Sequence, residues 1–242
     1  MNISSALDFI RVILSHTSHP GNIGATARAM KTMGLSHLYL VNPRHFPHEE
    51  ATARAANAVD VLQRAIICDS LDKALDNTVF SAAITARSRE LSHKVFDARQ
   101  GAKELLHYAN QQQPVALLFG RENSGLTSEE VSKCQIIIQI PANPEYPSLN
   151  LANAVQIMTY ELRMGLAEKS TQKDDNDILA SFNDVEAFYA HLEKLMVASE
   201  FLDLEKPKLL MQRIRRLFAR TRLEKEEIQV LRGILSALGK RW

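Results

Sequence analysis

The stretch that decides the fold is "IRVILSHTSHPGNIGATARAMKTMG", residues 10–34. A short apolar run comes first, then a turn with two glycines, then an alanine-rich segment of helix-forming residues. This order is typical of a strand followed by a crossover helix in a parallel sheet. Gly21 and Gly24 allow either a positive φ or a close approach of two backbones. Asn22 and Arg28 beside them are either solvated helix residues or functional ones.

Apolar runs of the same kind recur along the first 140 residues and alternate with helix-period segments. Nearly all of their residues are apolar, as expected of strands that are covered on both faces. The pattern predicts an α/β fold, with a mostly parallel sheet, helices on both faces and right-handed connections. The expected strands are Ile10–Leu14, His37–Val41, Val79–Thr85, Val115–Phe119 and Gln135–Ile140.

The character of the chain changes after this region. "SLNLANAVQIMTYELRM" has apolar residues at helical spacing, with Ser148 in the position of an N-cap. A polar, charged segment without aliphatic anchors follows and predicts a linker. Three helical segments come next, the first with a capping-box pattern at Asn183 and Glu186. We therefore expect an α/β domain, a linker and a small all-helical module, at residues 1–165, 166–178 and 179–242.

The net charge of +1 hides an asymmetry. Residues 206–242 contain eleven Lys or Arg and three acids, a balance of +8, which leaves −7 for the rest. A basic tail on a slightly acidic body indicates a polyanionic partner. No apolar run approaches the roughly 20 residues of a membrane span. The N-terminus lacks the basic segment and apolar stretch of a signal peptide, so we expect no membrane association.

Cysteine and histidine spacing favours neither a disulfide framework nor a metal site. Cys68 and Cys134 lie far apart, which indicates two free thiols in a reducing cytoplasm. Two histidine pairs lie in loops with no Cys or acid cluster to complete a zinc site. These pairs are His16 with His19 and His45 with His48.

Ligands of an open parallel sheet bind beyond the carboxyl ends of its strands, where the loops converge. The segment before Arg28 lacks the G-x-G-x-x-G of dinucleotide-binding folds and the Lys-Ser/Thr of a P-loop. The next strand ends in "LVNP", without an acid for a ribose diol. A nucleotide-dependent oxidoreductase or NTPase is therefore disfavoured. The candidate loops are Ser15–Gly24, Ala86–Arg89, Gly120–Gly125 and Pro141–Ser148.

The last two loops have unusual chemistry. In "FGRENSGLTSEE", two glycines bracket Glu122, a carboxylate that serves either as a general base or as an ion-pair partner of an arginine. Thr127 and Glu130 make a capping box for the next helix. In "IPANPEYPSLNLANA", three prolines within seven residues stiffen the backbone, and pre-ordering a loop mainly benefits a binder. Ordinary surface turns, with Ser148 as a routine cap, stay open as the alternative.

Together these segments resemble the three motifs of the SPOUT superfamily, and more narrowly of its 2′-O-methyltransferase branch. The motifs are "NIGATAR", "FGRENSGL" and "IPANPEYPSLNLANA", in this order at the ends of predicted strands. With the "ITARSR" loop and the helical extension, the chain resembles the TrmJ-type tRNA methyltransferases. The resemblance covers nearly all of the N-terminal domain and is mainly architectural in the C-terminal module.

The resemblance implies a trefoil knot in the C-terminal part of the α/β domain, with S-adenosylmethionine bound there largely by backbone groups. Such recognition constrains turns rather than side chains, so it leaves no conspicuous cofactor fingerprint. It also implies a homodimer whose site is completed by both subunits. Carried over by position, the cofactor-binding residues are Ile84, Thr85, Ala86, Gly120, Ile140, Pro147, Ser148 and Leu149.

The reaction implied by the resemblance is 2′-O-methylation of tRNA at cytidine or uridine 32 of the anticodon loop, where 2′-hydroxyls are accessible. Methyl transfer needs the hydroxyl aligned with the methyl group and its proton removed. We expect Arg28 to fix an RNA phosphate or the hydroxyl, because a guanidinium stays charged and is a poor base. Asn22, Ser148 and Asn150 would orient the reacting groups, and Glu122 would hold Arg28.

Besides Arg28, we expect the C-terminal basic cluster to bind tRNA phosphates, which makes affinity steeply salt-dependent. The alternative is an ordinary solvated basic helix. Two other functions also stay open: a catalytically inert RNA-binding protein with this fold, and a 2′-O-methyltransferase that acts on another RNA. The candidate RNA-binding residues of the cluster are Arg213, Arg215, Arg216 and Arg220.

Overall fold

A computed structural model of the chain describes residues 5–86, 94–167, 178–205 and 209–239. Within these ranges, seven parallel strands form one sheet in the order β3-β2-β1-β6-β4-β7-β5. All five predicted strands are confirmed. The two additional strands, β3 and β5, are three and four residues long and too short to give a clear pattern. The strands are β1 (Ile10–Ser15), β2 (His37–Val41), β3 (Ile66–Cys68), β4 (Phe80–Ile84), β5 (Lys94–Asp97), β6 (Val115–Phe119) and β7 (Ile136–Gln139).

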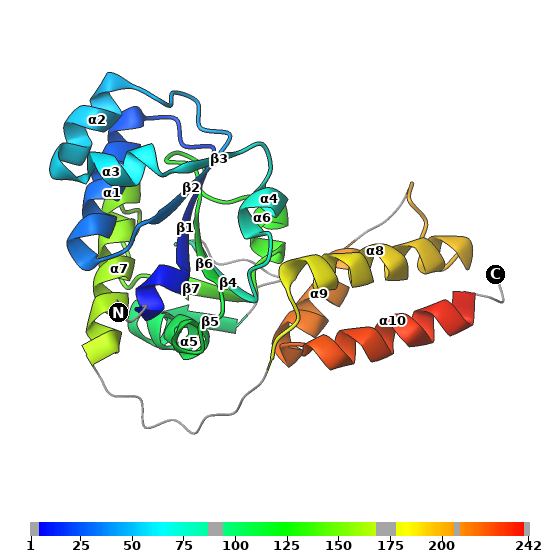
Figure 1. Cartoon of the computed structure of the whole chain (residues 1–242). Coiled ribbons are helices and arrows are strands. Elements are labelled where there is room, and N and C mark those ends of the chain that lie inside the picture. The colour runs from blue at the N-terminus through cyan, green and yellow to red at the C-terminus, as the bar shows by residue number, and fades with distance from the viewer. Residues whose placement is uncertain (1–4, 87–93, 168–177, 206–208, 240–242) are drawn as a thin grey trace.

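Helices cover both faces of the sheet (Figure 1). The helices of the α/β domain are α1 (Pro20–Met33), α2 (Glu49–Ala55), α3 (Val59–Gln63), α4 (Leu71–Leu75), α5 (Ala98–Asn110), α6 (Ser128–Ser132) and α7 (Leu151–Ala167), with short 3-10 turns at Ala6–Phe9 and Ala56–Ala58. On one face, α1, α5 and α7 bury a large apolar cluster against the strands. The opposite face carries a smaller cluster under α4 and α6, which are five residues each.

The turn after β1 is shorter than expected, because α1 begins at Pro20 with His19 as its N-cap. Proline fits the first helical position, where its missing N–H has no partner to lose. The second half of the predicted Ser15–Gly24 loop is therefore helical. Gly24 serves close approach rather than a positive φ, because an added Cβ would lie 2.0 Å from the carbonyl oxygen of Ala51 on α2.

The C-terminal part of the α/β domain crosses back over earlier elements. β7 lies between β4 and β5, which both precede it, and α7 then returns against α1 and α5. This path is consistent with the expected knot, which itself stays a prediction. α7 is capped by Asn150, whose Oδ1 accepts from the N–H of Ala152 at 2.9 Å, so the predicted Ser148 cap is wrong. α7 is described to Ala167, and most of the predicted linker 166–178 lies outside the described residues.

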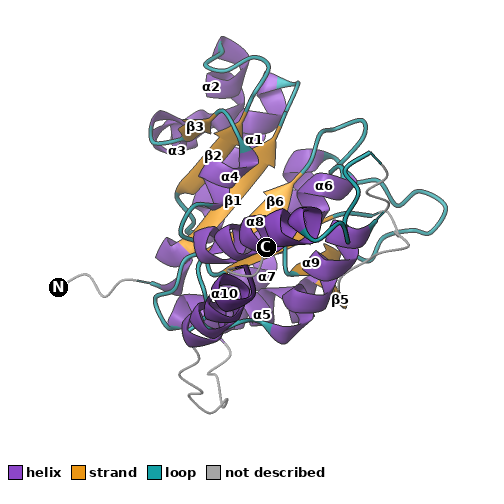
Figure 2. Cartoon of the chain, turned by 90° about the vertical axis from the view of Figure 1, so that its right-hand side faces the viewer, coloured by secondary structure: helices purple, strands orange, loops and turns teal. Residues whose placement is uncertain are grey.

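The C-terminal module consists of α8 (Phe182–Ala198), α9 (Leu210–Thr221) and α10 (Lys225–Gly239), with its own small apolar cluster. Figure 2 shows these helices in front of the sheet, on the face that carries α4 and α6. The N-cap of α8 is Ser181, which accepts from the N–H of Asp184, so the predicted capping box at Asn183 and Glu186 is wrong. Both of these residues make longer-range contacts described below.

Candidate functional site

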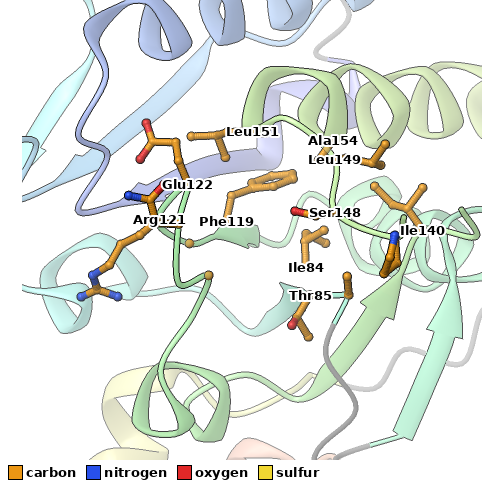
Figure 3. A pocket seen from close by; sticks show the side chains of 15 residues that line it. Ile84, Thr85, Phe119, Arg121, Glu122, Ile140, Ser148, Leu149, Leu151 and Ala154 are labelled. Carbon is orange, nitrogen blue, oxygen red and sulfur yellow. The ribbon is translucent and has the colours of Figure 1, made fainter. Parts of the chain in front are cut away.

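A cleft opens at the carboxyl ends of β4, β6 and β7, under the loop that leads into α7 (Figure 3). The loop Gly120–Gly125 forms one side. Ser148 projects toward the middle of the cleft, between Phe119 and Ile84. The cleft brings together all eight residues predicted to bind a cofactor: Ile84, Thr85, Ala86, Gly120, Ile140, Pro147, Ser148 and Leu149.

The cleft has both apolar and polar walls, and the loop before α7 contributes backbone groups to it. Phe119, Leu151 and Ala154 complete the apolar lining, and the sequence analysis did not single them out. Within residues 140–149, Tyr146 N to Asn143 O is the one backbone–backbone hydrogen bond that the structure describes. The N–H of Glu145 donates to the side chain of Asn143, and most of the carbonyl groups of this loop have capacity for a ligand. An apolar ring with polar edges, held by main-chain groups, fits this surface.

The carboxylate of Glu122 ties its loop to the start of α1. Its Oε2 accepts from the N–H and the hydroxyl of Ser18 at 3.1 and 3.0 Å. Its Oε1 accepts from the N–H of His19 at 3.1 Å and from the amide of Asn22 at 3.0 Å. Burial alone would raise the pKa of Glu122, but the hydrogen bonds from Asn22, Ser18 and His19 hold this pKa below its ordinary value. Glu122 is therefore a stable anion rather than a poised base.

Asn22 extends this contact to the third loop. Its Oδ1 accepts from the side-chain amide of Asn150 at 3.0 Å, and Asn150 caps α7. We call the chain Glu122–Asn22–Asn150 the asparagine relay. It connects the carboxyl ends of β1, β6 and β7 through three residues from the three predicted motifs.

A second carboxylate, Glu130, is buried and contacts Arg121, which lines the cleft. It accepts from the hydroxyl of Ser15, from the N–H of Thr127 at 2.6 Å and from Arg121 at 3.0 Å. Burial raises the pKa of Glu130, but these three donors outweigh it and leave the pKa lowered. The Thr127–Glu130 capping box is confirmed. The partners Ser15 and Arg121 were missed, because the sequence pattern shows only the local half of this network.

Arg28 lies apart from these contacts. It is exposed on α1 and is not among the described residues that line the cleft. It lies six positions after Asn22 on the helix, which points the two side chains about 120° apart around the helix axis. The hydrogen bonds that the structure describes for Glu122 go to Ser18, His19 and Asn22. The expectation that Glu122 holds Arg28 is therefore wrong for the single chain, because that carboxylate is already occupied.

The C-terminal arginines fall into different environments. Arg215 donates through both terminal nitrogens to Glu186, with Nη2 to Oε2 at 2.7 Å, and lies 4.4 Å from the ring centre of Tyr189. These internal contacts remove Arg215 from the set that faces a polyanion, which corrects the prediction. Arg213 and Arg220 are exposed, and Arg216 is half-buried.

Three further observations on the described ranges concern metal ligands, membrane spans and the two cysteines. They contain no group of three or more His, Cys, Asp or Glu side chains that could hold a metal ion. No helix in the part of the chain that the structure describes is long and apolar enough to cross a membrane. Cys68 and Cys134 are buried free thiols, and burial raises the pKa of Cys134 to about 12.

Known proteins resemble the chain in both parts. Residues 9–160 match the SpoU rRNA Methylase family, and residues 183–242 match the tRNA methyltransferase TrmJ, C-terminal domain. The tRNA (cytidine/uridine/adenosine-2′-O-)-methyltransferase TrmJ of Pseudomonas aeruginosa (strain UCBPP-PA14) is 46% identical, over 97% of this chain and 95% of that protein. The tRNA (cytidine/uridine-2′-O-)-methyltransferase TrmJ of Escherichia coli (strain K12) is also 46% identical, over 96% of each.

A solved structure agrees with these matches. The crystal structure of TrmJ from Z. mobilis ZM4 superposes with a TM-score of 0.84 at 32% identity, covering 95% of this chain and 98% of that one. The similarity thus extends over both the α/β domain and the helical module. The chain belongs to the SpoU methylase family and, within it, to the TrmJ group.

Proposed function

We propose that this protein transfers a methyl group from S-adenosylmethionine to the ribose 2′-hydroxyl of tRNA, at cytidine or uridine 32 of the anticodon loop. The observation that carries the proposal is the cleft, where the three motif loops meet through the asparagine relay. The TrmJ relatives are tRNA 2′-O-methyltransferases by name. The nucleotide position is the expectation drawn from the family resemblance. We place the protein in the cytoplasm, where reduced cysteines are the rule.

The lining of the cleft fits the chemistry of the cofactor. Ile84, Ile140 and Leu149 would pack against its adenine, and the free backbone groups of 140–149 would pair with its polar edges. When bound, the cofactor supplies a methyl group on a positively charged sulfur. Glu122 would add a negative charge at the edge of the cleft, which favours a cationic ligand. Ser148, which points into the cleft, would orient the ribose hydroxyl or the cofactor.

The asparagine relay would act by positioning. Methyl transfer requires the attacking oxygen in line with the methyl group, and small displacements of loops reduce the rate strongly. Glu122 and Asn150 fix the loops on either side of Asn22, so the reacting groups meet in one geometry. Arg28 would bind the RNA phosphate or the hydroxyl and stabilise the oxygen as its proton leaves.

A homodimer would complete the site. Arg28 lies outside the cleft of its own chain, which supports its action in the site of a second copy. Tyr160 and Met164 on α7 are about half exposed, and apolar groups of this size on one helix favour an interface. Arg213, Arg216 and Arg220 on α9 would bind the tRNA backbone outside the anticodon loop.

The test is methyl transfer from labelled S-adenosylmethionine to unmodified tRNA, with the product mapped by nucleotide. We expect one 2′-O-methyl group at nucleotide 32. A matched tRNA with a 2′-deoxy sugar at that position should accept none. Equal labelling of the deoxy tRNA would disprove the position, and labelling of ribosomal RNA alone would disprove the substrate. Cofactor binding without any transfer would favour the inert RNA-binding protein.

A further inference from the structure

We propose that Arg222 is a positioning residue that locks the C-terminal module onto the α/β domain, so that α9 presents its exposed arginines at a fixed place relative to the cleft. The proposal deepens the proposed function and rests on it for the identity of the RNA. Arg222 belongs by sequence to the basic cluster of 206–242. Its guanidinium is used in contacts within the protein, so we do not count it among the residues that bind a polyanion.

Arg222 is bound on three sides by the α/β domain. It lies at the corner between α9 and α10, where its φ of 52° places it in the left-handed region. Its Nη1 donates to the hydroxyl of Tyr108 at 3.1 Å, and its Nη2 donates to the carboxylate of Glu104. Its guanidinium lies 5.4 Å from the ring centre of Phe80. Glu104 and Tyr108 are one turn apart on α5, so both present their polar ends to the same arginine.

The module has a second attachment at the start of α8. The N–H of Phe182 donates to the carbonyl of Thr78 at 2.7 Å, and the side chain of Asn183 accepts from the N–H of Asn77 at 2.9 Å. The ring of Phe182 is buried in the apolar cluster under α4 and α6. α9 itself also packs against α6. Arg222, from the corner after α9, adds a charged contact with α5 to these attachments and thereby sets the orientation of α9.

The lock lies at the opposite end of the sheet from the cleft. Phe80 is the first residue of β4 and contacts Arg222, whereas Ile84 is the last and lines the cleft. Four residue steps along a strand span roughly 13 Å. Arg222 therefore acts on catalysis through the placement of α9 and not through contact with the cofactor.

Glu104 provides a test that separates this role from phosphate binding. If Arg222 were an RNA ligand, removing its acidic partner would free it and remove a negative charge, and tRNA would bind more tightly. If Arg222 is a lock, the same change releases the module and tRNA binds less tightly. The two roles therefore predict opposite signs for one substitution.

The experiment compares Glu104→Arg, Arg222→Glu and the double swap with Glu129→Arg, an exposed acid on α6 that makes the same charge change as Glu104→Arg. We expect each single change at the lock to raise the KM for tRNA about tenfold, which corresponds to about 1.4 kcal/mol for each variant. The Kd for S-adenosylmethionine should stay the same, and the double swap should restore most of the KM. Glu129→Arg should leave the KM unchanged or lower it.

Small-angle scattering of the same proteins without RNA gives a readout that does not depend on the substrate. The single variants should expand and the double swap should regain the wild-type profile. Tighter tRNA binding by Glu104→Arg, or a double swap no better than either single variant, would overturn the lock. If a reversal does not fold, Glu104→Gln and Arg222→Gln test the same coupling. If the wild type does not methylate tRNA but the variants still change the scattering profile as expected, the proposed function is wrong and the lock stands.

Discussion

Glu122→Gln tests whether the asparagine relay organises the site. The amide keeps the shape of the side chain but turns one acceptor oxygen into a donor. If the new amide faces Ser18, the hydroxyl rotates to accept from it, and the N–H of Ser18 loses its partner. An unsatisfied donor costs about 1–3 kcal/mol, and the bonds that remain weaken by roughly 1 kcal/mol in total when the charge is lost. We expect a loss of about 3 kcal/mol, or roughly 6–12 °C in Tm for a chain of this size.

The assay is thermal unfolding at pH 7.5, with Glu129→Gln as the control, followed by cofactor binding and transfer rate. The control removes an exposed carboxylate and should lose at most about 1 kcal/mol. Because the pKa of Glu122 is lowered, the wild-type advantage is complete above its ordinary value of 4.5 and fades as the pH falls through the lowered pKa. A Tm shift no larger than that of the control, with normal transfer, would refute the relay.

Four further substitutions probe other parts of the site. Arg28→Ala should reduce transfer at least about a hundredfold while the cofactor Kd stays constant, measured by single-turnover kinetics and calorimetry. Gly24→Ala should destabilise the protein by about 1–3 kcal/mol in urea unfolding, because its Cβ would overlap the carbonyl of Ala51. Glu130→Gln should lower stability by about 2 kcal/mol at pH 7 and by less below pH 4.5, since its pKa is also lowered. Arg220→Glu should weaken tRNA binding and reduce its salt slope by roughly one, measured by filter binding from 50 to 200 mM salt.

The sequence was sufficient to predict those strands and helices whose local pattern agrees with their packing in the structure. Apolar runs such as Val115–Phe119 are buried on both faces, so their composition alone indicates central strands. β3 and β5 were missed because they are edge strands of only three and four residues, and apolar runs of that length do not distinguish a strand from a helix segment. The start of α1 was misplaced because two glycines suggested a loop, whereas Gly24 is needed for contact with α2. That contact depends on tertiary packing, which no local pattern records.

The same distinction holds for the site. The residues expected to bind the cofactor were assigned by position from the family resemblance, and the structure brings all of them to one cleft. The partners of the charged side chains could not be assigned in this way, since Glu122 lies about a hundred residues from Asn22 in the chain, and Glu130 lies 115 residues from Ser15. Motif order placed Asn22, Glu122 and Asn150 near one edge of the sheet. Only the packed structure shows which of them bond to each other and that Arg28 is not included.

The number of basic residues counted from the sequence exceeds the number whose charge is available to bind RNA. Residues 213–222 contain five arginines, but Arg215 and Arg222 each donate to a carboxylate within the protein. A polyanion would have to displace those carboxylates before it could bind either guanidinium, and both pairs are partly buried. Each phosphate that is neutralised contributes roughly 0.7–0.9 to the salt slope. The cluster should therefore contribute about 2–3 to that slope rather than about 4, because Arg215 and Arg222 are already paired with Glu186 and Glu104.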